Sequence, residues 1–358
     1  MKKTSASVIA KKYSNYILIA VLTLIFAILY YSGNLTSRSF ITPNMLTQIG
    51  YTMILVISLN LVVGFLGELS LGHAGFMYIG AYAAGLFSHY TESFFTAPLL
   101  RLILSMAVGG IVAAIFGFIV GLPALRLRGD YLAIVTLAFG EIVRGVLKNI
   151  KIPGFIDLPA NGFSLPRYSQ SLFIVAFVAT LFTIFCVQNL VNSKHGRAIM
   201  AIRDNEIAAR SMGINITYYK LMVFAISSFL AGMAGAIFAH NNAVIYSTFN
   251  YNYSIEFLVM VVLGGMGSIL GSIISSIFLV IINIQLQSSL SGNLAGLKYL
   301  VYALILIITM IFNASPKFAP LREKLNWKYL ISKLRKKKES PAQNGEDSDN
   351  TSDATQDH

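Results

Sequence analysis

Long apolar runs recur along this chain, and they constrain its fold more than any other feature. A helix needs about 20 apolar residues to cross a hydrocarbon core about 30 Å thick, and most of the runs approach that length. The sequence therefore predicts an all-α fold, a polytopic membrane helical bundle with about ten transmembrane helices. The expected helices lie at 16–31, 45–66, 70–90, 99–122, 131–149, 171–191, 218–240, 255–267, 270–290 and 297–313.

The composition agrees with a membrane environment, because 56% of the residues are hydrophobic and only 12% are charged. Soluble domains carry about 25% charged residues. The formal net charge of +12 comes from Lys and Arg residues that flank the apolar runs rather than from a separate basic domain. This distribution argues against a nucleic-acid partner.

The positions of the basic residues predict the orientation of the chain in the cell membrane. If the runs cross alternately from a cytoplasmic N-terminus, 20 of the 27 Lys and Arg residues lie on the cytoplasmic side. Cytoplasmic segments of membrane proteins are enriched in basic residues. Both the N and C termini are therefore expected in the cytoplasm.

The composition also divides the chain into parts. No small-residue cleavage site follows the first apolar run, so that run is expected to be a retained helix rather than a signal peptide. The basic segment after the last run can lie against anionic membrane lipid, and the acidic tail is expected to be disordered. The expected boundaries are 1–15 for the cytoplasmic N-terminal segment, 16–313 for the transmembrane domain with a cytoplasmic loop at 193–217, 314–338 for the basic segment and 339–358 for the tail.

The sequence lacks the residue patterns of an enzyme site. It contains no HExxH, CxxC or G-x-S-x-G motif, and its single cysteine, Cys186, excludes an intrachain disulfide. It also contains no Gly-Lys dipeptide, so a nucleotide-binding Walker A loop is absent. We therefore expect a protein without catalytic residues, metal or cofactor, and any ATP that powers it must be hydrolysed by another chain.

Residues 60–82 contain ionisable side chains within an apolar, glycine-rich stretch. A charge at the bilayer centre costs about 2.5–3.5 kcal/mol, so a charge that is kept there usually faces a cavity or a partner. Glycine-interrupted helices form such sites in transporters, although an ordinary inner turn between two helices would also explain the stretch. The candidate residues for a translocation pathway are Gly67, Glu68, Ser70, Gly72, His73 and Gly75.

Two further stretches suggest turns on the cytoplasmic side. In 121–144, Pro123 and Gly129 mark an inner turn, and Glu141 and Arg144 are spaced to pair on one helical face. Membrane anchoring and helix-end pairing would also account for these charges. In 263–272, a GxxxG pattern at Gly267 and Gly271 permits close helix approach and a tight turn.

The stretch HGRAIMAIRDNEIAARSMG at 195–213 carries a cluster of charges between two apolar runs. We expect one helix of about eight residues, from Asp204 or Asn205 as N-cap to Gly213 just past its end. Arg203, Glu206 and Arg210 are spaced to form a ladder of alternating charge on one face. By charge alone, this is a helix that lies in water.

Several of these stretches together resemble the M-type (LivM-type) permease subunit of branched-chain amino acid ABC transporters. They are 67–84, 121–144, 196–214, 220–240 and 254–273. A glutamine often stands in that family where this chain has Glu68. The family signature stretch contains Gly121, Pro123, Arg126, Arg128, Gly129, Tyr131, Thr136 and Glu141.

The resemblance implies a contact with a motor protein. The segment from Glu206 to Gly213 has the form ExAAxxxG and is similar to the E-A-A loop of ABC importers, which implies a coupling helix docked in a groove of a cytoplasmic ATPase. Ala208 and Ala209 would allow close approach. The implied coupling residues are Gly196, Arg197, Arg203, Asp204, Glu206, Ala208, Ala209, Arg210 and Gly213.

The resemblance also implies the other partners: two ABC ATPase subunits, a second homologous permease subunit, an extracytoplasmic substrate-binding protein and an amino-acid substrate such as leucine, isoleucine or valine. Related architectures carry urea, other amino acids or nucleosides. An alternative of another class is an autonomous ion-coupled transporter, in which Glu68 or Glu141 would bind the coupling ion.

Overall fold

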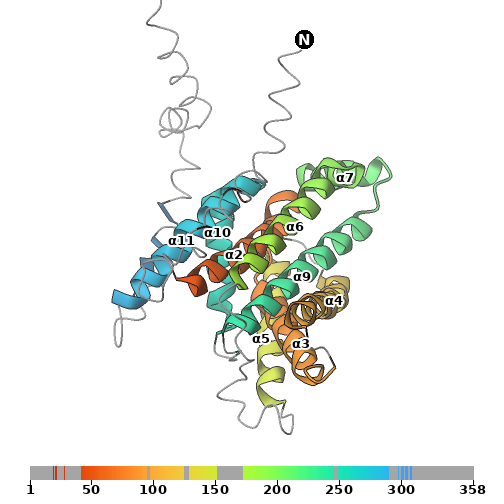
Figure 1. Cartoon of the computed structure of the whole chain (residues 1–358). Helices are drawn as coiled ribbons and strands as arrows, with labels where there is room; N and C mark the ends of the chain where they lie inside the picture. The colour runs from red at the N-terminus through yellow and green to blue at the C-terminus, as the bar shows by residue number, and fades with distance from the viewer. Residues whose placement is uncertain are drawn as a thin grey trace, which may run out of the picture. The chain divides into compact units, whose positions relative to one another are not determined.

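The structure is a computed structural model that describes most of the membrane domain (Figure 1). The expected first and last helices lie almost wholly outside the described residues, as do Arg126, Arg128 and the acidic tail. Residues up to Ala303 form one compact unit, to which the following description refers. The described residues are 19, 21, 28, 42–94, 97–124, 129–150, 172–242, 244, 248–289, 297, 300, 301, 303, 304, 307 and 308.

The described part of the chain is a helical bundle. Its elements are α2 (Pro43–Asn60), the π-helix η1 (Leu61–Leu66), α3 (His73–Tyr90), α4 (Pro98–Ala124), α5 (Asp130–Asn149), α6 (Leu172–Asn192), α7 (Lys194–Asp204), α8 (Glu206–Ser211), α9 (Ile216–Asn241), α10 (Tyr251–Gly264) and α11 (Ile269–Ser289). Within these residues, four segments are long and apolar enough to cross a membrane, namely Pro43–Leu66, Pro98–Pro123, Leu172–Asn192 and Ile216–Asn241.

Side-chain caps determine where several helices begin. Thr42 precedes Pro43 at the start of α2, and its hydroxyl accepts a hydrogen bond from Met45 N. Asn215 and Asn250 cap α9 and α10 in the same way. These caps satisfy backbone N–H groups that have no partner inside the helix.

The expected positions of the described helices are confirmed to within a few residues, with two differences. The helix expected at 70–90 begins only at His73, because the backbone from Gly67 to Gly72 connects η1 to α3 without helical structure. The loop at 193–217 contains α7 as well as the expected charged helix.

Helices α2 and α9 form the centre of the bundle. The apolar length of α2 is buried throughout and that of α9 for the most part, whereas α4 and α6 expose more than half of theirs. Figure 1 shows α2, α6 and α9 alongside one another, and α9 also packs against α3 and α4.

Three glycines allow α3, α4 and α9 to cross at very short range. A Cβ atom on Gly109 would lie 2.7 Å from the carbonyl oxygen of Gly80, and one on Gly80 would overlap the backbone of Gly232. A Cβ on Gly232 would in turn overlap the Gly109 carbonyl. Close backbone approach at small residues is a main source of helix association in membranes.

A tight turn joins α10 to α11. Gly265 and Gly267 have positive φ angles of 88° and 79°, which favour glycine. A Cβ on Gly271 would overlap the carbonyl oxygen of Gly264, so the two helices leave the turn in close contact. The turn and the close approach predicted for this stretch are confirmed, with Gly264 rather than Gly267 facing Gly271.

Candidate coupling site

The charged segment between α6 and α9 consists of two short helices. Ser193 begins α7 by accepting a hydrogen bond from Gly196 N at 3.3 Å. Asn205 begins α8, and its Oδ1 accepts hydrogen bonds from Ile207 N and Ala208 N, both at 3.0 Å. Gly213, with φ of 82°, follows the end of α8. The expected cap and ending residue are therefore confirmed, but α8 has six residues, and α7 was not expected.

The predicted charge ladder is wrong at Arg203. Asn205 is extended, with φ of −159° and ψ of 105°, so Arg203 belongs to α7 and does not continue the face of α8. Its guanidinium pairs with Asp204 Oδ1 at 2.9 Å and donates to the Gly64 carbonyl at 3.3 Å. The other half of the ladder is present, since Arg210 lies 3.4 Å from Glu206.

Arg203 attaches α7 to the region around η1. Gly67 has φ of 82°, and a Cβ atom there would lie 2.6 Å from Arg203 Cγ. A Cβ atom on Gly64 would overlap Gly267 N in the α10–α11 turn. Glycines at these positions therefore allow α7, η1 and the α10–α11 turn to meet.

Asn60 holds the same α10–α11 turn against η1. Its Nδ2 donates to Ser272 Oγ at 2.8 Å and to the Ser268 carbonyl at 3.1 Å, while its Oδ1 accepts from Gly267 N at 2.8 Å. The amide of a buried asparagine is thus satisfied on both sides. The connections 67–72, 193–215 and 265–268, all expected on the cytoplasmic side, converge here.

The centre of this site is Lys220, near the beginning of α9. Its ammonium group hydrogen-bonds Glu68 and lies 3.2 Å from Glu206 Oε2. Only 3% of the Lys220 side chain is exposed, compared with 13% for Glu68 and 26% for Glu206. A buried charge needs a partner that is both oppositely charged and hydrogen-bonded, and Lys220 has two.

Lys220 joins two stretches that are far apart in the sequence. Glu68 was a pathway candidate and Glu206 a coupling candidate, whereas Lys220 was counted only among the basic residues of the cytoplasmic side. The available signal was a lysine placed about one turn inside an apolar helix. We define Glu68, Glu206 and Lys220 as the buried charge bridge.

The face of α8 that points away from the bundle carries apolar side chains. Ile207 is 76% exposed and Met212 82% exposed. Ala208 is exposed as well, but Ala209 is buried against the bundle, so only one of the two alanines is available for close approach to a partner. Sequence reasoning identified the alanines and missed the two large apolar residues.

The remaining coupling candidates lie on α7. Arg197 is exposed, whereas Gly196 is buried at the junction with α6, where a Cβ atom would overlap the Val191 carbonyl. Gly196 therefore positions α7 and does not itself present a contact surface.

The other pathway candidates form the start of α3 and its contact with α5. His73 is buried, and its Nε2 lies 2.8 Å from Ser58 Oγ. Gly72 packs so closely on the Thr136 backbone that a Cβ atom would overlap it, and one on Gly75 would lie 2.9 Å from Gly140 Cα. Ser70 is also buried.

The signature residues that the structure describes lie at the end of α4 and along α5. Thr136 is buried, and its hydroxyl accepts from Leu71 N at 3.0 Å, which ties α5 to the connection before α3. Tyr131 is 70% exposed. Gly121 is buried and Pro123 exposed in the last turn of α4, and Gly129 begins α5 with φ of 59°.

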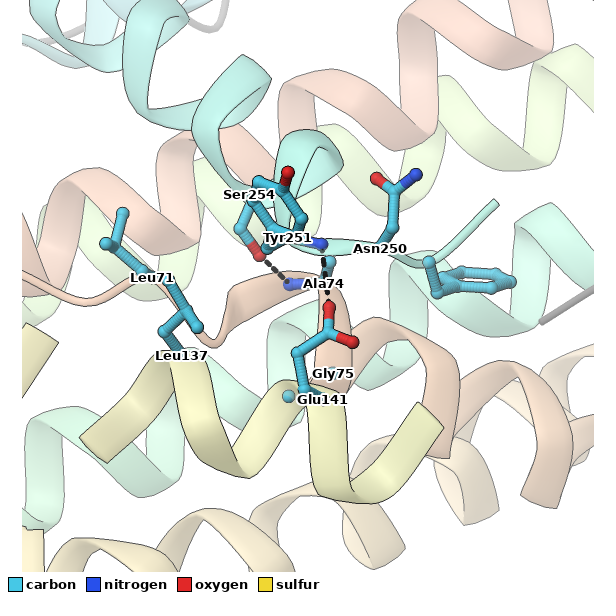
Figure 2. Close-up of a pocket in the computed structure, with 10 residues that line it drawn as sticks. Leu71, Ala74, Gly75, Leu137, Glu141, Asn250, Tyr251 and Ser254 are labelled. Atoms are coloured by element: carbon cyan, nitrogen blue, oxygen red, sulfur yellow. Dashed lines mark hydrogen bonds between the residues drawn. The ribbon is translucent and has the colours of Figure 1, made fainter. Parts of the chain in front are cut away.

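Glu141 lies in a shallow pocket between α3, α5 and α10 (Figure 2). The predicted pair with Arg144 is confirmed, with 2.7 Å between Arg144 Nη2 and Glu141 Oε2. Glu141 Oε1 also accepts from Tyr251 N, the first residue of α10, at 3.1 Å. Ser254 Oγ accepts from Ala74 N at 3.1 Å, which joins the first turns of α3 and α10.

The apolar helices and their close packing define a multi-pass helical membrane protein. Residues 41–310 match the family of permease components of branched-chain amino acid transport systems, and the chain belongs to that family. Its members are described as transport permease components.

Individual relatives agree with this family. The chain is 39% identical to the high-affinity branched-chain amino acid permease protein LivM of Escherichia coli, over 60% of this chain and 56% of LivM. It is 29% identical to a probable LivM of Methanocaldococcus jannaschii, over 62% and 74%. It is 28% identical to a guanosine ABC transporter permease protein of Bacillus subtilis, over 50% and 60%. The alignment thus spans little more than half of the E. coli relative, and no solved structure matches the chain.

Proposed function

We propose that the chain is the transmembrane permease subunit of an ABC importer and forms a translocation pathway for branched-chain amino acids with a second homologous permease subunit. An extracytoplasmic binding protein delivers the substrate, and two separate ABC ATPase subunits hydrolyse ATP. The observation that carries this proposal is α8, a capped surface helix with an ExAAxxxG sequence whose carboxylate Glu206 is bonded to a lysine inside the bundle.

The proposed orientation places α8 in the cytoplasm of a cell-membrane protein with about ten transmembrane helices and both termini cytoplasmic. The excess of basic residues supports this orientation, as does the convergence of three expected cytoplasmic connections around Arg203 and Lys220. We assign 16–313 to the permease domain, with 1–15, 314–338 and 339–358 as cytoplasmic segments.

The buried charge bridge supplies a mechanism for coupling. The exposed Ile207 and Met212 fit an apolar groove on an ATPase, and Arg197 and Arg210 orient the helix at its rim. When the ATPases close, movement of α8 pulls on Lys220 through Glu206. Because Lys220 also holds Glu68, the movement reaches the connection that precedes α3.

The test is uptake into proteoliposomes that contain both permeases, the two ATPases and the binding protein. We expect ATP-dependent uptake of labelled leucine, isoleucine and valine, and none when the ATPases are omitted. Because one relative is named for guanosine transport, guanosine is offered in parallel. Guanosine uptake without leucine uptake would show that the transported substrate is a nucleoside. Leucine uptake by this chain alone would establish an ion-coupled carrier instead of an ABC importer.

The variant Glu206→Lys tests the coupling assignment. It places a cation beside Lys220 and Arg210 in place of their shared carboxylate, so we expect α8 to be displaced and recovery of the ATPases on purified permease to fall by about tenfold or more. Glu92→Lys is the control, because it reverses the charge of another carboxylate paired with an arginine, Arg101, at 3.4 Å. Normal ATPase recovery and transport with Glu206→Lys would refute the role of Glu206.

A further inference from the structure

Helix α5 carries an ion pair at the edge of the bundle, where the surrounding surface is apolar. Ile134, Ile142 and Val146 on this helix are each more than half exposed. Beside them, the side chains of Glu141 and Arg144 are 29% and 33% exposed.

The depth of this ion pair makes it unusual. At 1.5 Å per residue, Glu141 lies about 16 Å along α5 from its cytoplasmic end, close to the middle of a core about 30 Å thick. Ionised side chains at that depth are costly against lipid and almost always face a water-filled cavity or the interior of a bundle. The exposed edge of the pair must therefore face water or protein.

Two other helices begin at the same place. The start of α3 packs on Gly140, and the first N–H of α10 donates to Glu141. Figure 2 shows the Glu141 carboxylate directed toward Tyr251, with Leu71 and Leu137 to one side. The lining therefore combines the Glu141 carboxylate with apolar side chains that include Leu71 and Leu137. The Arg144 guanidinium is not part of the lining but pairs with this carboxylate.

We propose that Glu141 and Arg144 form a binding site for a zwitterionic aliphatic amino acid on the translocation pathway. The inference rests on the proposed function and adds the location and chemistry of the site. The substrate ammonium pairs with Glu141, the substrate carboxylate pairs with Arg144, and the aliphatic side chain lies against Leu71 and Leu137.

The ion pair explains how such a site can be empty between substrates. Without a ligand, Glu141 and Arg144 neutralise each other, and Tyr251 N satisfies the second carboxylate oxygen. An amino acid exchanges this internal pair for two pairs of its own, so binding is weak and readily reversed. An uncharged sugar or nucleoside offers no such exchange.

Cysteine accessibility tests whether this edge faces the pathway. The single cysteine makes the background simple: Cys186→Ser removes it, and Ala138→Cys introduces a thiol on the exposed face of α5 one turn before Glu141, leaving the ion pair intact. In the complete complex in lipid nanodiscs, we expect Ala138→Cys to react with a charged, membrane-impermeant thiol reagent. Phe182→Cys on the exposed side of α6 should remain unmodified.

The outcome separates three arrangements. If Ala138→Cys reacts in the complete complex, the result supports the proposal that this edge of α5 faces the translocation pathway. A thiol that is unreactive in the complex but reactive in the isolated subunit shows that the second permease covers α5, and a thiol that reacts in neither shows that α5 faces lipid. Both of the latter results overturn the proposal.

Charge neutralisation tests the binding chemistry. We expect Glu141→Gln and Arg144→Gln each to lower leucine uptake by about tenfold or more, because a charged hydrogen bond to the substrate is lost. ATP hydrolysis stimulated by the substrate-free binding protein should stay near the wild-type rate. Glu92→Gln is the matched control. Unchanged uptake with both variants overturns the site but leaves the proposed function intact, whereas a wild-type complex that imports no leucine refutes the proposed function itself.

Discussion

The variant Lys220→Met should unfold far more readily than the wild type, with a loss of about 3–5 kcal/mol in the free energy of unfolding. The substitution keeps the apolar stem but removes the ammonium that holds Glu68 and Glu206. Two carboxylates are then left close together without their shared cation. The loss is measured by denaturant titration of the purified subunit in detergent, followed by circular dichroism.

The neighbouring variant Glu68→Gln separates charge from contact. A glutamine oxygen still accepts a hydrogen bond from Lys220, and Glu206 still neutralises the ammonium group. We therefore expect a loss of only about 0.5–1.5 kcal/mol in the free energy of unfolding.

In the assembled complex, the fraction of the Lys220→Met variant that folds should hydrolyse ATP without importing substrate. Equal stability of Lys220→Met and wild type would show that the buried charge bridge does not form.

The variant Gly232→Ala should destabilise the bundle although it adds a single carbon atom. Its Cβ would overlap the Gly109 carbonyl and lie 2.5 Å from Ala113 Cβ, so α4 and α9 must separate. Overpacking of this kind costs about 1–3 kcal/mol, and here the obstacle is backbone that cannot rotate away. We expect a lower midpoint of thermal unfolding and less folded protein in the membrane.

The control for this prediction is Gly145→Ala on α5. A Cβ atom at Gly145 has no neighbour within 4 Å, so the same chemical change meets open space. Its thermal midpoint should equal or exceed that of the wild type, because alanine favours a helix more than glycine does. If both glycine variants behave alike, the three-glycine crossing of α3, α4 and α9 does not limit stability.

Local sequence was sufficient to locate the long apolar helices that the structure describes and several of their ends. The expected helix at 99–122 is α4, and that at 171–191 is α6, because an apolar run long enough to cross a membrane has few other structures available. The Asn205 cap and the Glu141–Arg144 pair were also predictable, since both depend on residues within one turn.

The candidate site was predictable only in part. The extended backbone at Asn205 separates Arg203 from α8, so Arg203 bonds to the Gly64 carbonyl and does not join Glu206 in a charge ladder. The helix α7 was missed because it has only 11 residues and several charged side chains, so it does not form a long apolar run; only Gly196, Ile199 and Ile202 are buried. A short amphipathic segment between two long apolar runs is easily interpreted as part of a charged loop.

The sequence by itself determined that this protein is a membrane helical bundle with a charged helix outside it, because hydrophobic length, capping residues and short-range pairs act within one segment. Only the tertiary structure decided which charges meet. Lys220 is separated from Glu206 by 14 residues and from Glu68 by 152, and the packing of α9 against η1 and α7 brings them together. Glycines at the crossings permit that packing, since the backbones must approach before a buried lysine can reach both carboxylates.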